Sequence, residues 1–133
     1  MVTRIFVDTS ALLTLLDADD PRQERVRATF AEHADDELVT HGYVVAESLA
    51  VTRRRFGLDG VVTMLDDVLP AVTILPVEPT LHAAAQAAYR TSLPSGTSFV
   101  DQVSFTLIEH EGIEVAFALD PDFEAAGIAV LGT

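Results

Sequence analysis

The segment Arg4-Ile5-Phe6-Val7-Asp8-Thr9-Ser10-Ala11-Leu12-Leu13 sets the pattern that the rest of the chain repeats. Its apolar run 5–7 is continuous, as in a strand that is buried on both faces. The run stops at Asp8, and the pair Thr9-Ser10 provides natural caps for a helix that begins at the next residue. A carboxylate is thus expected at the carboxyl end of a central strand, which is the edge where open α/β sheets bind ligands. A capping role alone for these three polar residues remains the alternative.

Strand and helix patterns alternate along the remaining chain. Short apolar or β-branched runs predict further strands at 37–40, 72–75, 115–119 and 128–131. Helical spacing and capping signals predict helices at 11–16, 21–34, 43–54, 60–69, 81–89 and 98–111. This alternation predicts an α/β fold with a central mostly parallel sheet of four to five strands, covered by helices on both faces. We expect one domain over residues 1–133.

Composition limits the environment and the chemistry. The chain has no cysteine, which excludes disulfides and thiolate metal sites. No apolar run approaches the ~20 residues of a membrane span, and no signal peptide is evident, so a cytoplasmic location is expected. The chain is 49% hydrophobic, which is high for its size, and we expect part of its apolar surface to contact a partner or a second copy.

Taken alone, the net charge of −13 argues against a nucleic-acid partner, whose phosphates would be repelled. It favours cations or a basic partner. All eight basic residues are arginines, and Arg53, Arg54 and Arg55 are consecutive.

Four acids stand out by their positions. Asp8 and Asp120 each follow an apolar strand pattern, and Glu47 lies among apolar neighbours in the predicted helix 43–54. Asp101 lies in the first turn of the helix 98–111. Because the carboxyl ends of parallel strands share an edge with the amino ends of the helices that follow them, these side chains are expected to converge.

Two of these acids have ordinary structural alternatives. Glu47 could form a buried pair with an arginine, since an inward carboxylate without a partner is costly. Ser98 and Asp101 have nearly the spacing of a capping box, and the helix dipole favours a negative charge in the first turn.

A cluster of carboxylates resists ionisation unless a divalent cation is bound among them. Oxygen ligands of this kind suit Mg²⁺ or Mn²⁺. The four histidines are isolated along the sequence, at positions 33, 41, 82 and 110, and are expected to be core or surface residues rather than zinc ligands.

Four short pieces carry a resemblance to a known family. They are Phe6-Val7-Asp8-Thr9-Ser10-Ala11-Leu12, Tyr43-Val44-Val45-Ala46-Glu47-Ser48, Ser98-Phe99-Val100-Asp101 and Phe117-Ala118-Leu119-Asp120-Pro121-Asp122-Phe123. In this order and at this chain length, they resemble the PIN-domain nucleases, and most of all the small bacterial toxins of VapC type. The resemblance covers essentially the whole chain.

The resemblance implies a three-layer α/β/α fold and a ribonuclease that depends on Mg²⁺ or Mn²⁺. Asp8, Glu47 and Asp101 match the core acids of the family, and Asp120 matches the fourth, with Asp122 as a neighbour that might substitute. Beside these metal-binding and catalytic acids, the resemblance implies supporting roles for Thr9 or Ser10, as the hydroxyl near the metal, and for Ser98, ahead of the third acid.

The resemblance also implies partners. These are an RNA substrate, a cognate VapB-like antitoxin and a second copy of the chain in a homodimer. Arg53, Arg54 and Arg55 lie ~9–12 Å along the helix from Glu47, at a distance that suits contacts to a flanking phosphate. A solvated helix end is the alternative for these arginines.

Two rival functions remain. A phosphatase-like enzyme would use Asp8 as a nucleophile, but such folds need a well-placed lysine and the chain contains none. A PIN-like binding module without effective catalysis would act only through its protein partner. The departure His41-Gly42, where the family often has a polar pair ending in asparagine, leaves room for this second reading; Gln102 after Asp101 is also less usual.

Overall fold

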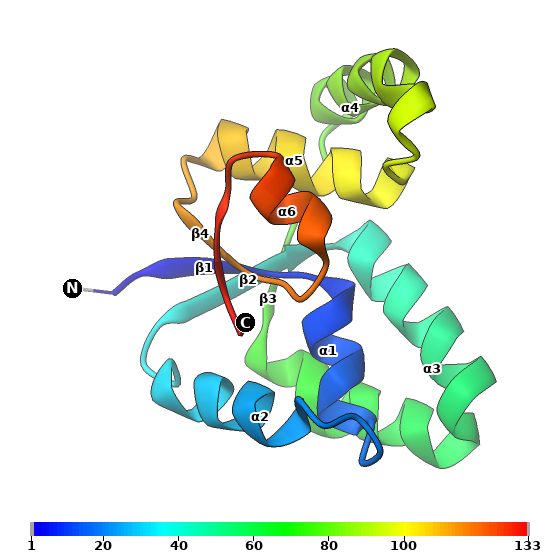
Figure 1. Cartoon of the computed structure of the whole chain (residues 1–133), viewed down its shortest axis with the longest axis vertical. Helices are drawn as coiled ribbons and strands as arrows, with labels where there is room; N and C mark the ends of the chain where they lie inside the picture. The colour runs from blue at the N-terminus through cyan, green and yellow to red at the C-terminus, as the bar shows by residue number, and fades with distance from the viewer. Residues whose placement is uncertain (1, 133) are drawn as a thin grey trace.

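The computed structural model describes residues 2–132, so positions 1 and 133 of the predicted domain lie outside the described part. Its centre is a sheet in the order β3-β2-β1-β4-β5, and every pair of neighbouring strands is parallel (Figure 1). The strands are β1 (Arg4–Val7), β2 (Glu37–His41), β3 (Thr73–Leu75), β4 (Val115–Phe117) and β5 (Ala129–Leu131). The predicted parallel sheet is confirmed, with five strands.

Helices cover the sheet on both faces. They are α1 (Thr9–Leu16), α2 (Gln23–Glu32), α3 (Gly42–Thr63), α4 (Pro79–Ser92), α5 (Phe99–Glu111) and α6 (Pro121–Ala125). In Figure 1, α1, α2 and α3 lie below the strands, whereas α4, α5 and α6 lie above them. The result is the three-layer α/β/α arrangement expected from the alternating pattern. Among residues 2–132, no helix is both long and apolar enough to cross a membrane.

The core is built around β1. Ile5, Phe6 and Val7 are almost completely buried, as predicted from their continuous apolar run. The Phe6 ring stacks on Phe123 of α6 at a centroid distance of 6.1 Å. Full burial of a side chain of this size contributes about 1.5–3 kcal/mol, so this strand is a main anchor of the fold.

The order of the strands determines where a ligand can bind. The chain builds β1, β2 and β3 outward in one direction and then returns to place β4 on the other side of β1. The connections after β1 and β4 therefore diverge to opposite faces, which opens a crevice at the carboxyl ends of these two strands. Backbone N–H of Asp8 donates to Phe117 O at 3.0 Å and holds the two strand ends together.

Three local details differ from the predictions. The N-cap of α1 is Asp8 rather than Thr9 or Ser10, because the Asp8 carboxylate accepts the Ser10 N–H. Strand β4 ends at Phe117, two residues earlier than expected. The predicted helices 43–54 and 60–69 are joined within α3 across a sharp break at Gly57, whose φ of 71° few other residues adopt.

The predicted helix 60–69 has apolar residues at helical spacing, but this stripe is only partly buried; it comprises Val61, Met64, Leu65 and Val68. Met64 is fully buried, whereas Leu65 is 48% exposed. From Met64 to Val68 the backbone forms a π-helical turn, so the α-helical spacing on which the prediction relied is not maintained.

Candidate metal centre

A hollow of about 350 Å³ lies at the crevice beside the carboxyl ends of β1 and β4. Side chains from four separate parts of the chain line it, and they include every acid and hydroxyl residue that the sequence analysis singled out. These are Asp8, Thr9, Ser10, Glu47, Ser98, Asp101, Asp120 and Asp122. The structure therefore brings together residues that are up to 114 positions apart, counted from Asp8 to Asp122.

Asp8 is fixed at the inner side of the hollow. It is 3% exposed, and its Oδ2 accepts hydrogen bonds from Ser10 N at 3.2 Å and from Ser10 Oγ at 2.7 Å. The Ser10 hydroxyl in turn accepts the N–H of Leu119 at 2.9 Å. Burial raises the pKa of Asp8 to about 6, although the Ser10 hydrogen bonds act in the opposite direction.

Asp101 faces Asp8 from the first turn of α5. Ser98 is the N-cap of this helix, and its Oγ accepts the Asp101 N–H at 3.1 Å. The capping interpretation is therefore correct for Ser98. The Asp101 carboxylate is different, because it forms no hydrogen bond within residues 2–132 and lines the hollow.

The electrostatic position of Asp101 is unfavourable for a free carboxylate. Its pKa is raised to about 7, mainly by burial and further by the charges of Asp8, Asp120, Asp122 and Glu47. At neutral pH this side chain therefore keeps a large share of its proton unless a cation is close.

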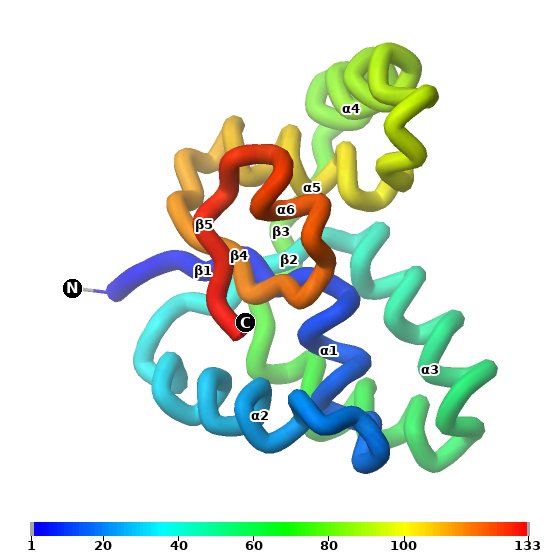
Figure 2. Tube along the Cα trace, viewed as in Figure 1, coloured from blue at the N-terminus to red at the C-terminus, as the bar shows by residue number. Residues whose placement is uncertain are grey.

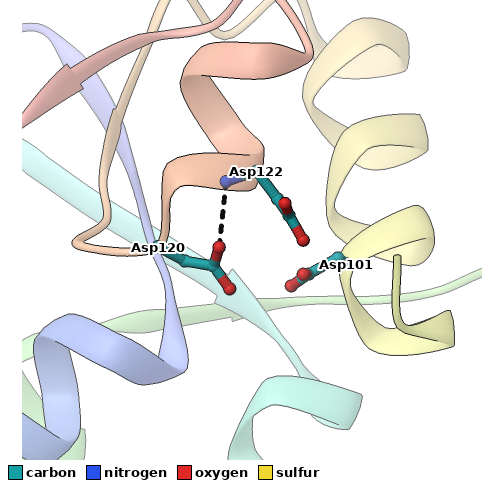
Figure 3. Close-up of side chains that lie close together, drawn as sticks. All are labelled: Asp101, Asp120 and Asp122. Carbon is teal, nitrogen blue, oxygen red and sulfur yellow. Dashed lines mark hydrogen bonds between the residues drawn. The ribbon is translucent and has the colours of Figure 1, made fainter. Parts of the chain in front are cut away.

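Three of the acids approach one another most closely. One carboxylate oxygen each from Asp101, Asp120 and Asp122 lies within 4.8 Å of the others, and Figure 3 shows these side chains directed into the space between α5 and α6. Asp120 caps α6 by accepting the Asp122 N–H at 2.9 Å. Carboxylate oxygens gathered in this way fit a hard divalent cation, so the residues present are suited to Mg²⁺ or Mn²⁺.

Glu47 reaches the hollow from α3. The fully buried stripe of this helix is formed by Val44, Ser48 and Thr52, and Glu47 lies beside that stripe and is half-buried. Its neighbours Tyr43, Val44 and Val51 are buried or half-buried, whereas Ala50 is exposed. Within residues 2–132, Glu47 forms no ion pair with an arginine.

The arginine cluster lies outside the hollow. Arg53, Arg54 and Arg55 are all exposed on α3. Arg55 pairs with Asp17 at 2.9 Å, and its guanidinium carbon lies 5.0 Å from the centre of the Phe56 ring. Arg55 is therefore engaged by contacts within the chain, on the surface of α3.

His41 supports the site from behind, and its role was not foreseen. It is fully buried, and its Nδ1 accepts the N–H groups of Tyr43 and Val44 at 3.1 and 3.4 Å, which caps α3. Its proton is therefore on Nε2, which donates to Ser104 Oγ of α5 at 2.9 Å. Burial lowers the pKa of His41 to about 4 and keeps the ring neutral. His41 thus links the helices that carry Glu47 and Asp101.

Comparison with known proteins assigns the family. The family described as the PIN domain matches residues 5–129. The curated 23S rRNA-specific endonuclease VapC20 of Mycobacterium tuberculosis is 30% identical over 126 residues, which cover 92% of this chain and 94% of that protein.

Solved structures give the same result. The crystal structure of M. tuberculosis VapC20, described as a sarcin–ricin loop cleaving toxin, matches with a TM-score of 0.85 and 29% identity over 94% of this chain and 96% of that one. VapBC2 from Rickettsia felis, bound to a DNA fragment from its promoter, matches with a TM-score of 0.75 over 97% and 98% of the two chains; at 10% identity it supports the fold alone. On these matches the chain belongs to the PIN-domain family, and it is a member of the VapC type.

Proposed function

We propose that this protein is a ribonuclease toxin that hydrolyses RNA phosphodiester bonds with the help of Mg²⁺ or Mn²⁺. The observation that carries the proposal is the convergence of Asp8, Glu47, Asp101, Asp120 and Asp122 on one hollow at the switch point of the sheet. The family assignment supports it, and so does the similarity to VapC20, which is named as an endonuclease.

The acids have distinct roles in this proposal. Asp8, Asp101, Asp120 and Glu47 would hold the cation, and Asp122 could replace Asp120. A divalent cation at such a site would supply an activated water molecule and neutralise charge on the phosphate. Its charge would also favour the ionised form of Asp101, whose pKa is raised by burial and by the neighbouring carboxylates.

Other residues of the chain orient these ligands. Ser10 holds one oxygen of Asp8 with two hydrogen bonds, so that the second oxygen faces the hollow. Ser98 fixes the first turn of α5 beneath Asp101. The buried hydroxyl oxygen of Thr9 has no hydrogen-bond partner within residues 2–132, and we assign it to the same polar lining.

The net charge of −13 shapes the choice of substrate. It repels an extended RNA backbone, so we expect weak nonspecific binding and recognition of a folded RNA. The relative VapC20 is named as specific for 23S rRNA, and we propose a structured ribosomal RNA loop as the substrate of this chain too. Arg53 and Arg54, which are exposed and form no ion pair within residues 2–132, are proposed to contact flanking phosphates.

A protein partner is also part of the proposal. Leu58, Val62 and Leu65 are large apolar side chains left exposed after the break at Gly57. We propose that a VapB-like antitoxin controls the enzyme in the cytoplasm and that the toxin itself is a homodimer, with apolar surface of this kind covered in the assembly.

The rival functions are less well supported. The binding-module reading relied on His41-Gly42, but His41 caps α3 and thereby helps to place Glu47. The phosphatase-like reading needs a lysine, and the sequence has none.

Cleavage of a panel of structured RNAs tests the proposed function. The panel includes a hairpin with the sarcin–ricin loop, and each RNA is incubated with Mn²⁺, Mg²⁺ or EDTA. We expect metal-dependent cleavage by the wild type and by Asp66→Asn, which removes an exposed acid outside the hollow. Folded Asp8→Asn and Asp101→Asn proteins should be inactive. Cleavage that persists in both variants and in EDTA would refute the proposal.

A further inference from the structure

A second hollow, of about 550 Å³, lies over the end of α4 and the start of α5. Its walls include the rings of Tyr89 and Phe99 together with Gln86 and Arg90. In Figure 2 the chain leaves α4 and turns back into α5 at this place. None of the roles assigned above uses these four residues.

The second hollow is continuous with the carboxylate site along the chain. Gly96 and Ser98 line the carboxylate hollow, and the next residue, Phe99, lines the second one. Ser98 and Phe99 are consecutive residues, with Cα atoms ~3.8 Å apart, so both hollows border the start of α5.

The aromatic wall is held in place from behind. The Phe99 ring stacks on Tyr43 at a centroid distance of 6.1 Å and contacts His82 edge-on at 5.5 Å. The Tyr89 ring also packs edge-on against the Phe99 ring, at a centroid distance of 5.5 Å. The Tyr43 hydroxyl is hydrogen-bonded to His82 Nδ1. Because the rings are already ordered, stacking a flat ligand on them costs little additional entropy.

The polar side chains that line the second hollow are not engaged in other interactions within the described structure. Gln86 and Arg90 are exposed and lie four residues apart on the same face of α4. Neither side chain forms a hydrogen bond or an ion pair within residues 2–132. Glutamine pairs with N6 and N7 of adenine and arginine with O6 and N7 of guanine, so both recognise the same edge of a purine.

We propose that the hollow formed by Gln86, Tyr89, Arg90 and Phe99 binds an unpaired purine base next to the cleaved phosphodiester. The inference rests on the proposed ribonuclease function and adds a specificity site to it. The base stacks on the aromatic wall while Gln86 or Arg90 bonds to its edge. Unpaired loop bases are the usual targets of sequence-specific RNA recognition, and stacking supplies affinity that a protein of charge −13 cannot gain from its overall field.

Fluorine NMR tests binding independently of catalysis. The sequence contains two tyrosines, so protein labelled with 3-fluorotyrosine gives one signal from Tyr43 and one from Tyr89. The probe is a sarcin–ricin loop hairpin RNA, with Ca²⁺ replacing Mn²⁺, and a second hairpin carries pyrimidines in its loop. We expect the purine loop to shift the Tyr89 signal and the pyrimidine loop to shift it much less. Spectra of Tyr89→Phe assign the signals.

Kinetics with matched variants test the same site. Tyr89→Leu should raise KM for the purine loop about 10- to 100-fold with little change in kcat, and Tyr89→Phe should restore KM because it keeps the ring. Arg90→Ala should also raise KM. Arg25→Ala is the control, since it removes an exposed arginine from α2 on the opposite face of the sheet and should leave KM unchanged.

The outcomes separate this inference from the proposed function. If the RNA is cleaved while the Tyr89 signal does not move and Tyr89→Leu keeps the wild-type KM, the base site is wrong and the ribonuclease remains. If the purine loop shifts the Tyr89 signal but no RNA is cleaved with Mn²⁺, the base site stands and the ribonuclease fails. A Tyr89 signal that follows protein concentration without RNA would assign the hollow to a second copy and overturn the inference.

Discussion

Ser10 Oγ lies 2.7 Å from Asp8 Oδ2, and the same hydroxyl accepts the backbone N–H of Leu119 at 2.9 Å. One hydroxyl therefore aligns the first acid of the site with the segment that leads to Asp120. The position of two proposed ligands depends on this contact, although Ser10 itself need not touch the metal.

Replacing Ser10 with alanine should weaken Mn²⁺ binding. Loss of a side chain that orients a metal ligand typically costs 10–100-fold in metal affinity, and we expect a change of about this size. Isothermal titration calorimetry with Mn²⁺ measures it. Ser10→Thr keeps the hydroxyl and is the control; equal Mn²⁺ affinity of the wild type and Ser10→Ala would contradict this role.

Asp101→Asn should make the metal-free protein more stable at pH 8. The pKa of Asp101 is about 7 in the folded protein, against an ordinary value of 3.8 for an aspartate, so its contribution to stability is complete below about pH 4 and is lost as the pH rises through 7. Asparagine has no charge to bury, and we expect a gain of about 1–3 kcal/mol in the free energy of unfolding at pH 8.

Thermal unfolding in EDTA at pH 5 and pH 8 measures this effect. The difference between Asp101→Asn and the wild type should be small at pH 5 and should grow at pH 8, whereas the exposed control Asp66→Asn should show no such change. Added Mn²⁺ should reverse the order, because only the wild type retains the full set of ligands. A variant that is less stable than the wild type in EDTA at pH 8 would refute the argument.

His41 should give the stability of the protein a pH dependence opposite in sign to that of Asp101. Its pKa is about 4 in the folded state, against an ordinary value of 6.5 for a histidine, so its stabilising contribution is present above about pH 6.5 and is lost as the pH falls toward 4. The cause is burial, which excludes a charged imidazole from the space beside Phe6 and Ser104.

His41→Asn removes this dependence while it keeps a good N-cap for α3. We expect the free energy of unfolding to fall by about 1–3 kcal/mol at pH 7, because the Ser104 hydrogen bond is lost and the side chain is smaller. The decrease should be smaller at pH 5. Chemical unfolding at both pH values tests this, with exposed His110→Asn as the control. An equal loss at pH 5 and pH 7 would show that His41 is not kept neutral by the fold.

The three consecutive arginines should behave differently from one another. Arg53→Ala and Arg54→Ala should weaken RNA binding and lower the slope of log K against log salt by about 1 each, because each removes one proposed phosphate contact. Arg55→Ala should change that slope less, because Arg55 is paired with Asp17. Fluorescence anisotropy at several salt concentrations distinguishes these cases; three identical slopes would refute the distinction.

Much of the fold could be predicted from the sequence because its signals are local. The run Ile5–Val7 is buried on both faces and reads as a central strand from its composition alone. Both parts of α3 were predicted, as the helices 43–54 and 60–69 on either side of Gly57. The π-helical turn Met64–Val68 was not predicted, because no residue pattern in this segment distinguishes it from an α-helix.

The acids of the site could be predicted because each follows a strand or opens a helix, and topology then brings such positions to one edge. The role of His41 could not be predicted in this way. His41 links two helices through its hydrogen bond to Ser104, which is 63 residues away. No local sequence pattern predicts a contact over that separation. The second hollow was missed for the same reason, because Tyr89 and Phe99 meet only when α4 packs on α5.

The wide spacing of the acids has a consequence for biosynthesis. Asp8 is translated first, but β4, which pairs with β1 in the middle of the sheet, and Asp120 and Asp122 emerge more than a hundred residues later. A nascent chain therefore cannot assemble the centre before residue 122 has left the ribosome. A ribonuclease toxin with this topology is in this way inactive while its chain is still attached to the ribosome.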